Sequence, residues 1–200
     1  DPTEDRVIDL VGGRDDIRGR LIRTIGDPLQ RFEEDRLRML RAIRFAARFD
    51  YGIEEATYEA LGRLAAGLAE ISPERIGEEL LKILCGPNAG RSLRLMADTG
   101  LLPVILPEIQ ALVGLEQPID FHPEGDVFEH TCRMLDLAED PSPEMALGIL
   151  LHDVGKPDTF QITDRIRFDE HDKVGAEKAR LVCRRLRCST AATERVVDLV

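Results

Sequence analysis

Residues 31–49 read R-F-E-E-D-R-L-R-M-L-R-A-I-R-F-A-A-R-F, and this stretch decides the fold that we expect for the chain. It contains neither Gly nor Pro, and nearly all of its residues are good helix formers. At about 100° per residue, apolar side chains share one side of a helix, namely Leu40, Ile43 and Ala47. Arginines share another arc together with Glu34, namely Arg38, Arg41, Arg44 and Arg48. The stretch therefore predicts a single helix with an arginine stripe.

The composition of the whole chain also favours helices. Among its 200 residues Trp is absent and aromatic residues make up 4%, while Leu, Ala, Arg and Glu dominate. The cysteines form no C-x-x-C pair, and no stretch resembles a signal peptide or a membrane span. We expect a reduced, cytoplasmic chain with no membrane partner.

The charge of the chain argues against a general nucleic-acid-binding protein. The net charge is -11, and residues 101–150 alone carry 1 basic and 10 acidic groups. This distribution leaves the arginine stripe able to face phosphate. We expect any affinity for RNA to be local and modest rather than a general electrostatic attraction.

Two interpretations of the arginine stripe are open. One is a solvated helix face on which Glu34 and Arg38 pair at i, i+4. The other is a recognition edge, because Asp35 and Arg38 at i, i+3 would set an acceptor beside a donor. Such an edge fits the Watson-Crick side of cytosine or adenine and mismatches guanine and uracil.

The run E-D-x-x-R-x-L-R, from Glu34 to Arg41, resembles the nucleotide-selecting motif of the class II tRNA nucleotidyltransferases. These are the CCA-adding enzymes, and the bacterial poly(A) polymerases are their relatives. The resemblance implies that Asp35 and Arg38 contact the incoming base and that Arg41 contacts the nucleotide. It also implies that Glu34 holds an arginine in place. The implied partners are CTP, ATP and the tRNA 3′ end.

Residues 1–25 resemble the segment that leads out of the catalytic head of that family, with matches at Asp9, Gly13 and Asp16. In the family, the head carries a D-x-D pair that holds magnesium. No two aspartates of this chain stand in a D-x-D arrangement, and the adjacent Asp15 and Asp16 point apart. We therefore expect a part of a longer enzyme that does not polymerise nucleotides by itself.

A second group of chemistry-bearing residues lies in the C-terminal half. His130, the pair His152 and Asp153, and His171 follow one another on expected helices. Imidazole and carboxylate ligands suit a catalytic divalent metal, whose bound water could attack a phosphate ester while Lys156 meets the phosphate charge. The alternative is a helix cap or packed histidines without a metal.

The order H, then H-D-x-G-K-P, then F-x-x-H-x-x-x-G-A resembles the HD-domain phosphohydrolases fused to many CCA-adding enzymes. The resemblance implies His130, His152 and Asp153 as metal ligands, with His171 as a further ligand or a phosphate contact. The metal would be Mg, Mn, Ni or Co. HD domains usually add a later Asp, for which Asp198 is a candidate.

We also expect helices over residues 54–68 and from Ser72-Pro73 onward, with Arg75 and Glu79 paired on the helix surface. The run L-L-P-V-I-L-P-E predicts a buried, partly irregular connector. Residues 7–10 and the following Gly-Gly predict a short strand and turn.

The fold class predicted from these patterns is all-α, with a short extended segment at the N-terminus. Residues 1–25 would end the nucleotidyltransferase head, residues 26–114 would form a helical neck and body, and residues 115–200 would form an incomplete HD domain. The intact protein would add CCA or A to tRNA, and its HD domain would hydrolyse phosphates at RNA 3′ ends. The alternatives are a poly(A) polymerase, a stand-alone HD phosphohydrolase and a non-catalytic RNA-binding module.

Overall fold

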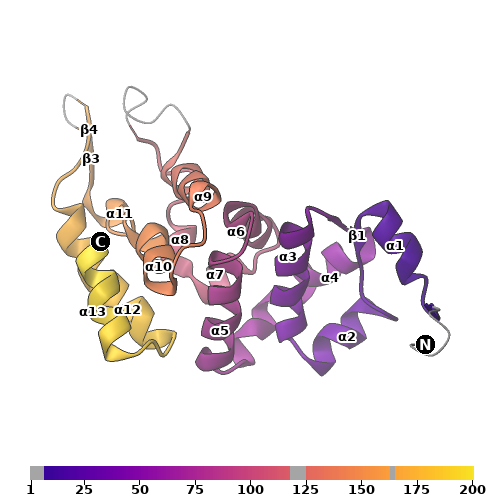
Figure 1. The fold of residues 1–200 in the computed structure, drawn as a ribbon. Coiled ribbons are helices and arrows are strands. Elements are labelled where there is room, and N and C mark those ends of the chain that lie inside the picture. Colours follow the sequence, from indigo (N-terminus) through magenta and orange to yellow (C-terminus); the bar gives the residue numbers. More distant parts are fainter. Residues whose placement is uncertain (1–6, 118–124, 163–164) are drawn as a thin grey trace.

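The computed structural model describes residues 7–117, 125–162 and 165–200. Helices dominate these ranges, which confirms the all-α prediction. The helices follow one another along an elongated body, with α1 (Gly13–Gly19) near one end and α12 (His171–Arg185) and α13 (Thr190–Leu199) at the other (Figure 1). Within the described ranges, none of the helices is both long and apolar enough to cross a membrane.

The prediction of one helix over residues 31–49 is wrong. The stretch is divided between α2 (Pro28–Glu34) and α3 (Leu37–Phe49), and Asp35 between them has an extended backbone with φ -151° and ψ 99°. Its carboxylate accepts a hydrogen bond from the backbone N–H of Leu37 at 3.3 Å. An Asp side chain that binds the first turn of a helix favours a new helix start over helix continuation.

The N-terminal segment packs beside the end of α3 through a short parallel sheet. Strand β1 (Leu21–Ile22) pairs with β2 (Gly52–Ile53). The strand predicted over residues 7–10 is absent, because Asp9 instead accepts hydrogen bonds from the N–H groups of Gly13 and Arg14 at 3.0 and 2.9 Å at the start of α1. These bonds from backbone N–H groups, together with one from Val11, lower the pKa of Asp9.

The middle of the chain is a helical array. It consists of α4 (Glu55–Leu64), the 3-10 helix η1 (Ala65–Glu70), α5 (Pro73–Leu84), α6 (Ala89–Asp98), α7 (Leu102–Ile105) and α8 (Pro107–Gln110). The helix predicted over residues 54–68 thus ends at Leu64 and tightens into η1. The connector predicted to be partly irregular is also helical, because each of its prolines lies at the start of a short helix, where a missing N–H costs nothing.

The C-terminal part contains α9 (Val127–Leu137), α10 (Pro143–Leu151), α11 (Lys156–Thr159), the hairpin β3 (Phe160–Ile162) and β4 (Ile166–Phe168), and the paired helices α12 and α13. The stretch of residues 118–124 before α9 lies outside the described residues. Asp126 caps α9 and Ser142 caps α10 through side-chain oxygens that accept backbone N–H groups.

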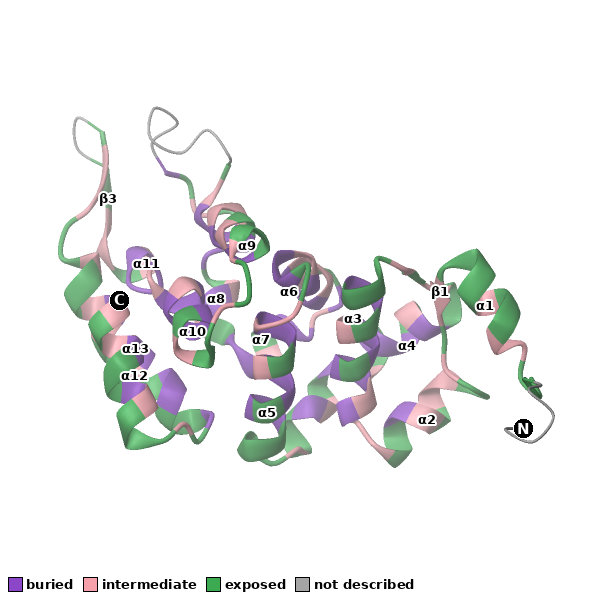
Figure 2. Ribbon diagram, in the orientation of Figure 1, coloured by how far each residue is buried: buried purple, intermediate pink, exposed green. Residues whose placement is uncertain are grey.

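One continuous core runs through the molecule, with buried faces on α3, α6 and α10 (Figure 2). Helix α6 packs on α9, and α5 packs on α10, across the boundary expected near residue 115. Gly90 permits the first of these contacts, since an added Cβ would collide with the carbonyl oxygen of Cys132. The division into domains at residues 25 and 114 stays a prediction.

Candidate functional site

At the break between α2 and α3, the partly buried carboxylate of Asp35 lies beside two arginines. Arg75 on α5 donates from Nη2 to Oδ1 of Asp35 at 3.1 Å. Arg41 on α3 lies with Nη1 3.8 Å from Oδ2. The predicted surface pair between Arg75 and Glu79 is therefore wrong, because the Arg75 guanidinium binds a residue 40 positions earlier.

Arg38 is held by a separate set of contacts. Its Nη1 donates to Oε2 of Glu34 at 2.8 Å and to the carbonyl oxygen of Arg31 at 2.9 Å. Glu34 also accepts from Arg31 at 2.6 Å, and its hydrogen bonds with these arginines, led by that of Arg38, lower its pKa. Asp35 and Arg38 are close in sequence, but the described hydrogen bonds direct their side chains to different partners.

Arg44, the third arginine of the stripe, faces inward. Arg44 Nε donates to Oε1 of Glu79 at 2.6 Å, and both side chains are largely buried between α3 and α5. A wholly solvated arginine face, one of the two interpretations, is therefore wrong at Arg44, which forms a buried ion pair, whereas Arg38 stays partly exposed.

The second group of residues meets where three helices end or begin. His130 lies on α9, His152 follows the last residue of α10, and His171 is the first residue of α12. Nitrogen or oxygen atoms of His130, His152 and Asp153 all lie within 4.8 Å of one another. The sequence prediction of three ligands that converge on one point is consistent with this geometry.

Backbone carbonyls orient two of the imidazole rings. Nδ1 of His152 lies 2.8 Å from the carbonyl oxygen of Ile149, and Nδ1 of His171 lies 2.8 Å from that of Phe168. With Nδ1 beside a carbonyl oxygen, Nε2 is the atom of each ring that faces Asp153, at 3.1 and 3.9 Å from its oxygens. This is how metal-binding histidines are commonly held.

Asp153 is a buried carboxylate with unmet hydrogen-bonding capacity. Its Oδ2 has no hydrogen-bond partner of suitable geometry among the described residues, although Lys156 Nζ lies 2.8 Å away. Burial raises the pKa of Asp153, but close contact with His152 at 3.1 Å and the charges of His152 and Lys156 outweigh burial and lower this pKa to about 2. For His152, burial is the largest single effect and lowers the pKa, but the contact with Asp153, the negative charge of Asp153 and the carbonyl of Ile149 together raise the pKa.

The buried carboxylate of Asp153 and the imidazole rings of His130 and His152 form a donor set that fits a divalent metal. The residues present therefore fit the metal predicted for this site. His171 does not belong to the group of atoms that lie within 4.8 Å of one another, so it lies at the edge of the proposed metal site.

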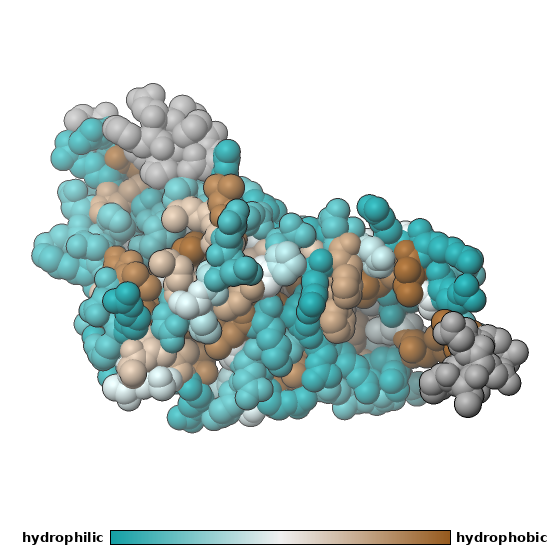
Figure 3. Space-filling view, in the orientation of Figure 1, coloured by the Kyte–Doolittle hydropathy of each residue, from teal (hydrophilic) through white to brown (hydrophobic). Residues whose placement is uncertain are grey.

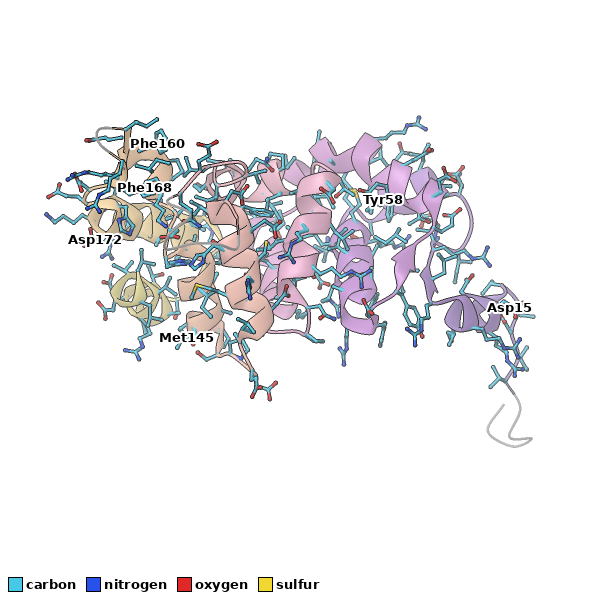
Figure 4. All side chains as sticks on the ribbon, turned by 90° about the horizontal axis from the view of Figure 1, so that it is seen from above. Asp15, Tyr58, Met145, Phe160, Phe168 and Asp172 are labelled. Carbon is cyan, nitrogen blue, oxygen red and sulfur yellow. The ribbon has the colours of Figure 1, made fainter. Side chains whose placement is uncertain are left out.

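The cluster opens into a cavity of about 580 Å³. The lining residues are His130, His152, Asp153, Lys156, Arg165, Ile166, Arg167, Phe168, Asp169 and His171. Figure 4 shows Phe160 and Phe168 beside each other on the hairpin, near Asp172 at the start of α12. Sequence reasoning missed Arg165 and Arg167, which the alternation R-I-R-F immediately before Asp169 could have indicated as residues on one face of a strand.

Lys156 faces the cluster rather than solvent. Its Nζ donates to Oε1 of Gln117 at 3.1 Å and lies 5.2 Å from the centre of the Phe168 ring. Asp198, the candidate for a later ligand, does not line the cavity; it is exposed on α13, close enough to Arg180 to influence the pKa of that guanidinium.

Comparison with known proteins finds two family matches and several relatives that cover nearly the whole chain. Residues 50–112 match the family described as "Probable RNA and SrmB- binding site of polymerase A", and residues 127–200 match the HD domain. The chain is 37% identical over 96% of its length to the multifunctional CCA protein of Halorhodospira halophila and 40% identical over 97% to the CC-adding tRNA nucleotidyltransferase of Thermus thermophilus. It is 36% identical over 98% to the A-adding tRNA nucleotidyltransferase of Deinococcus radiodurans.

Over nearly its whole length, the chain is similar to tRNA nucleotidyltransferases.

The chain corresponds to a part of these relatives. It spans about half the length of the curated relatives that it matches, 47%, 46% and 47% in the order given above. Among solved structures of tRNA nucleotidyltransferases, it resembles the Bacillus stearothermophilus CCA-adding enzyme in complex with CTP, with a TM-score of 0.56 and 27% identity. That similarity covers 96% of this chain and 49% of the solved chain.

Proposed function

We propose that this chain supplies the nucleotide-selecting part of a tRNA nucleotidyltransferase that adds CCA, or its terminal A, to the tRNA 3′ end from CTP and ATP. The observation that carries the proposal is the Asp35 carboxylate, held at the break between α2 and α3 by Arg75 on one oxygen and near Arg41 on the other. The Asp35 side chain remains 24% exposed beside these two guanidinium groups.

Asp35 and Arg38 would have complementary roles toward the base. A carboxylate oxygen of Asp35 would accept the exocyclic amino group that cytosine and adenine both carry. Both described hydrogen bonds of Arg38 use Nη1, so other N–H groups of the guanidinium would serve as donors to the neighbouring ring nitrogen. Glu34 would hold Arg38 in this orientation, and Arg41 would contact the nucleotide.

The test is nucleotide addition by a protein in which this chain follows a nucleotidyltransferase head that holds Mg²⁺. Asp35→Ala should reduce discrimination of CTP and ATP against UTP and GTP by about tenfold or more, since one base-specific hydrogen bond contributes about 1–3 kcal/mol. Glu33→Ala, an exposed carboxylate two positions away, is the matched control. Unchanged selectivity in the Asp35 variant would remove the proposal. Addition of long A tracts in preference to CCA would favour the poly(A) polymerase alternative.

The second candidate function is hydrolysis of phosphate esters by the HD part, and the cluster of His130, His152 and Asp153 carries it. A divalent ion held by these residues would supply a bound water of lowered pKa as the nucleophile. Lys156, Arg165 and Arg167 line the same cavity, where their positive charges would bind a phosphate group. Substrates would be 2′,3′-cyclic or terminal phosphates at RNA 3′ ends.

This function is tested by metal content and by hydrolysis of a 2′,3′-cyclic nucleotide with added Mg²⁺, Mn²⁺, Ni²⁺ or Co²⁺. His152→Ala and Asp153→Ala should each abolish metal binding and turnover. Asp172→Ala, an exposed carboxylate beside the cavity, should change neither (Figure 4). Absence of both metal and turnover in the unaltered chain would instead support a non-catalytic RNA-binding module.

A further inference from the structure

The exposed face of α3 beyond Arg41 carries two phenylalanines. Phe45 and Phe49 are 36% and 52% exposed, which is unusual for side chains of this size. Their rings stack at a centroid distance of 6.1 Å and an interplanar angle of 15°, and the Tyr51 ring lies 5.8 Å beyond Phe49. Figure 3 shows apolar surface over α3 bordered by hydrophilic side chains.

Arginines accompany both rings. The guanidinium carbon of Arg44 lies 4.5 Å from the centre of the Phe45 ring, and that of Arg48 lies 5.9 Å from the centre of the Phe49 ring. A cation near the face of an aromatic ring is attracted to it electrostatically, which helps to hold the ring in place. The result is an ordered row of rings and guanidinium groups on the surface.

A basic pocket adjoins this row between α3, α5 and the start of α6. The pocket encloses about 390 Å³ and is lined by Arg44, Arg48, Lys82, Ile83, Cys85, Gly86, Pro87 and Ser92. The buried Glu79 contacts two of these cations, at 2.6 Å from Arg44 and 3.6 Å from Lys82. Three cations thus line the pocket, and two of them contact the one buried carboxylate. The nearby Asp50 is bound to Arg91. In a chain of net charge -11, this surface is locally positive.

We propose that this aromatic and basic face of α3, defined by Phe45, Phe49, Arg48 and Lys82, is a binding platform for single-stranded RNA. Bases stack on the two rings, and phosphates enter the basic pocket. A contact with another protein would account for the exposed rings but not for the cations beside them. A simple phosphate site would account for the cations but not for the exposed rings. Exposed rings beside cations are the usual features of sites for single-stranded nucleic acid.

The position of the platform identifies the strand that it holds, an inference that rests on the proposed nucleotide-selecting function. Phe45 follows Arg38 by seven residues on one helix, a rise of about 10 Å. That distance matches about three stacked bases, so the platform would hold the last nucleotides of the RNA 3′ end beside the incoming nucleotide.

The test is the affinity of the chain for a short single-stranded RNA that ends in CC and carries 2-aminopurine three nucleotides from its 3′ end. Binding to the unaltered chain should quench the fluorescence of 2-aminopurine, because this base stacks on a phenylalanine ring. The double variant Phe45→Leu/Phe49→Leu should lose about tenfold in affinity and most of the quenching, since each stacked base contributes about 1–3 kcal/mol. Tyr58→Leu is the matched control, because this partly exposed aromatic on α4 has Asp98 rather than an arginine nearby.

The phosphate contacts have their own measurement. Lys82→Gln and Arg48→Gln should each reduce the slope of log affinity against log salt by about 0.7, while quenching at saturation remains. Thermal melting of every variant establishes that it is folded. RNA affinity and quenching unchanged in the folded double phenylalanine variant would overturn the proposal, as would a change confined to its oligomeric state, which would identify a protein contact instead.

Failure of the platform and failure of the proposed function give different results. Asp35→Ala should change the choice of nucleotide but leave the affinity for the RNA oligonucleotide as it was. The double phenylalanine variant should weaken RNA binding and leave the choice between CTP and UTP as it was.

Discussion

Arg75 Nη2 donates a hydrogen bond to Asp35 Oδ1 at 3.1 Å, although the two residues lie 40 positions apart. The bond joins α5 to the break between α2 and α3, so a distant segment positions the carboxylate together with the local N–H of Leu37. Arg75 therefore has a positioning role in the proposed nucleotide site.

Arg75→Ala should weaken nucleotide selectivity without abolishing nucleotide addition. The Arg75 side chain is about half exposed, so the pair contributes about 0.5–1 kcal/mol, and the ratio of CTP to UTP incorporation should fall roughly twofold to fivefold. Arg63→Ala, an exposed arginine on α4, should leave the ratio unchanged. Equal ratios in both variants would show that Arg75 does not position Asp35.

Glu79→Ala should lower the free energy of unfolding by about 3 kcal/mol, because it leaves the largely buried Arg44 guanidinium without its carboxylate. The measurement is urea denaturation followed by circular dichroism. Glu78→Ala, which removes the exposed carboxylate next to it, should stay within about 0.5 kcal/mol of the unaltered chain. A similar loss in both variants would contradict the structural role of the Arg44 and Glu79 pair.

Lys156→Met should tighten binding of a divalent ion and weaken binding of phosphate esters. The ammonium group lies 2.8 Å from Oδ2 of Asp153, where it competes with a metal for the carboxylate. Loss of one charge-assisted contact, about 1.4 kcal/mol, corresponds to about tenfold in metal affinity by calorimetric titration. Lys173→Met, an exposed lysine paired with Glu170, should change neither quantity. Weaker metal binding in the Lys156 variant would show that the lysine supports the site instead.

Gly155→Ala should destabilise the HD part by about 1–3 kcal/mol and weaken metal binding. An added Cβ would collide with the carbonyl oxygen of His171 and approach the N–H of Gly175, so α12 would be pushed away from the cluster. Gly62→Ala on α4 should be neutral or stabilising by up to about 1 kcal/mol, because its Cβ would meet only ordinary contacts. Thermal melting of the two variants separates these outcomes.

Cys188 should be alkylated by iodoacetamide with a pH midpoint near 7. The hydrogen bond from the Cys183 thiol outweighs burial and lowers the Cys188 pKa to about 7. Thiolate is the reactive form, so the rate should rise as pH increases through 7 and level off above 8. Cys85, whose pKa is raised by burial and by the charge of Glu144, should react only at higher pH. In Cys183→Ala the midpoint for Cys188 should move upward, and an unchanged midpoint would exclude the hydrogen bond as the cause.

The sequence determined the fold class and supplied the candidate residues of both sites. Helix-forming composition and apolar periodicity are local properties, so an all-α chain could be predicted without knowledge of packing. His152 and Asp153 could be predicted as a pair for a similar reason. They are adjacent in sequence at the end of one helix, so they stay together wherever that end packs.

The tertiary structure decided how these residues are used. One helix became two because Asp35 binds the backbone N–H of Leu37, a competition that helix propensity does not register. Arg75 and Glu79, one turn apart on α5, bind Asp35 and Arg44 instead of each other, because packing of α5 against α3 brings those partners within reach. Sequence spacing fixes which side chains share a helix face, but only the packing of distant segments determines which charges they meet there.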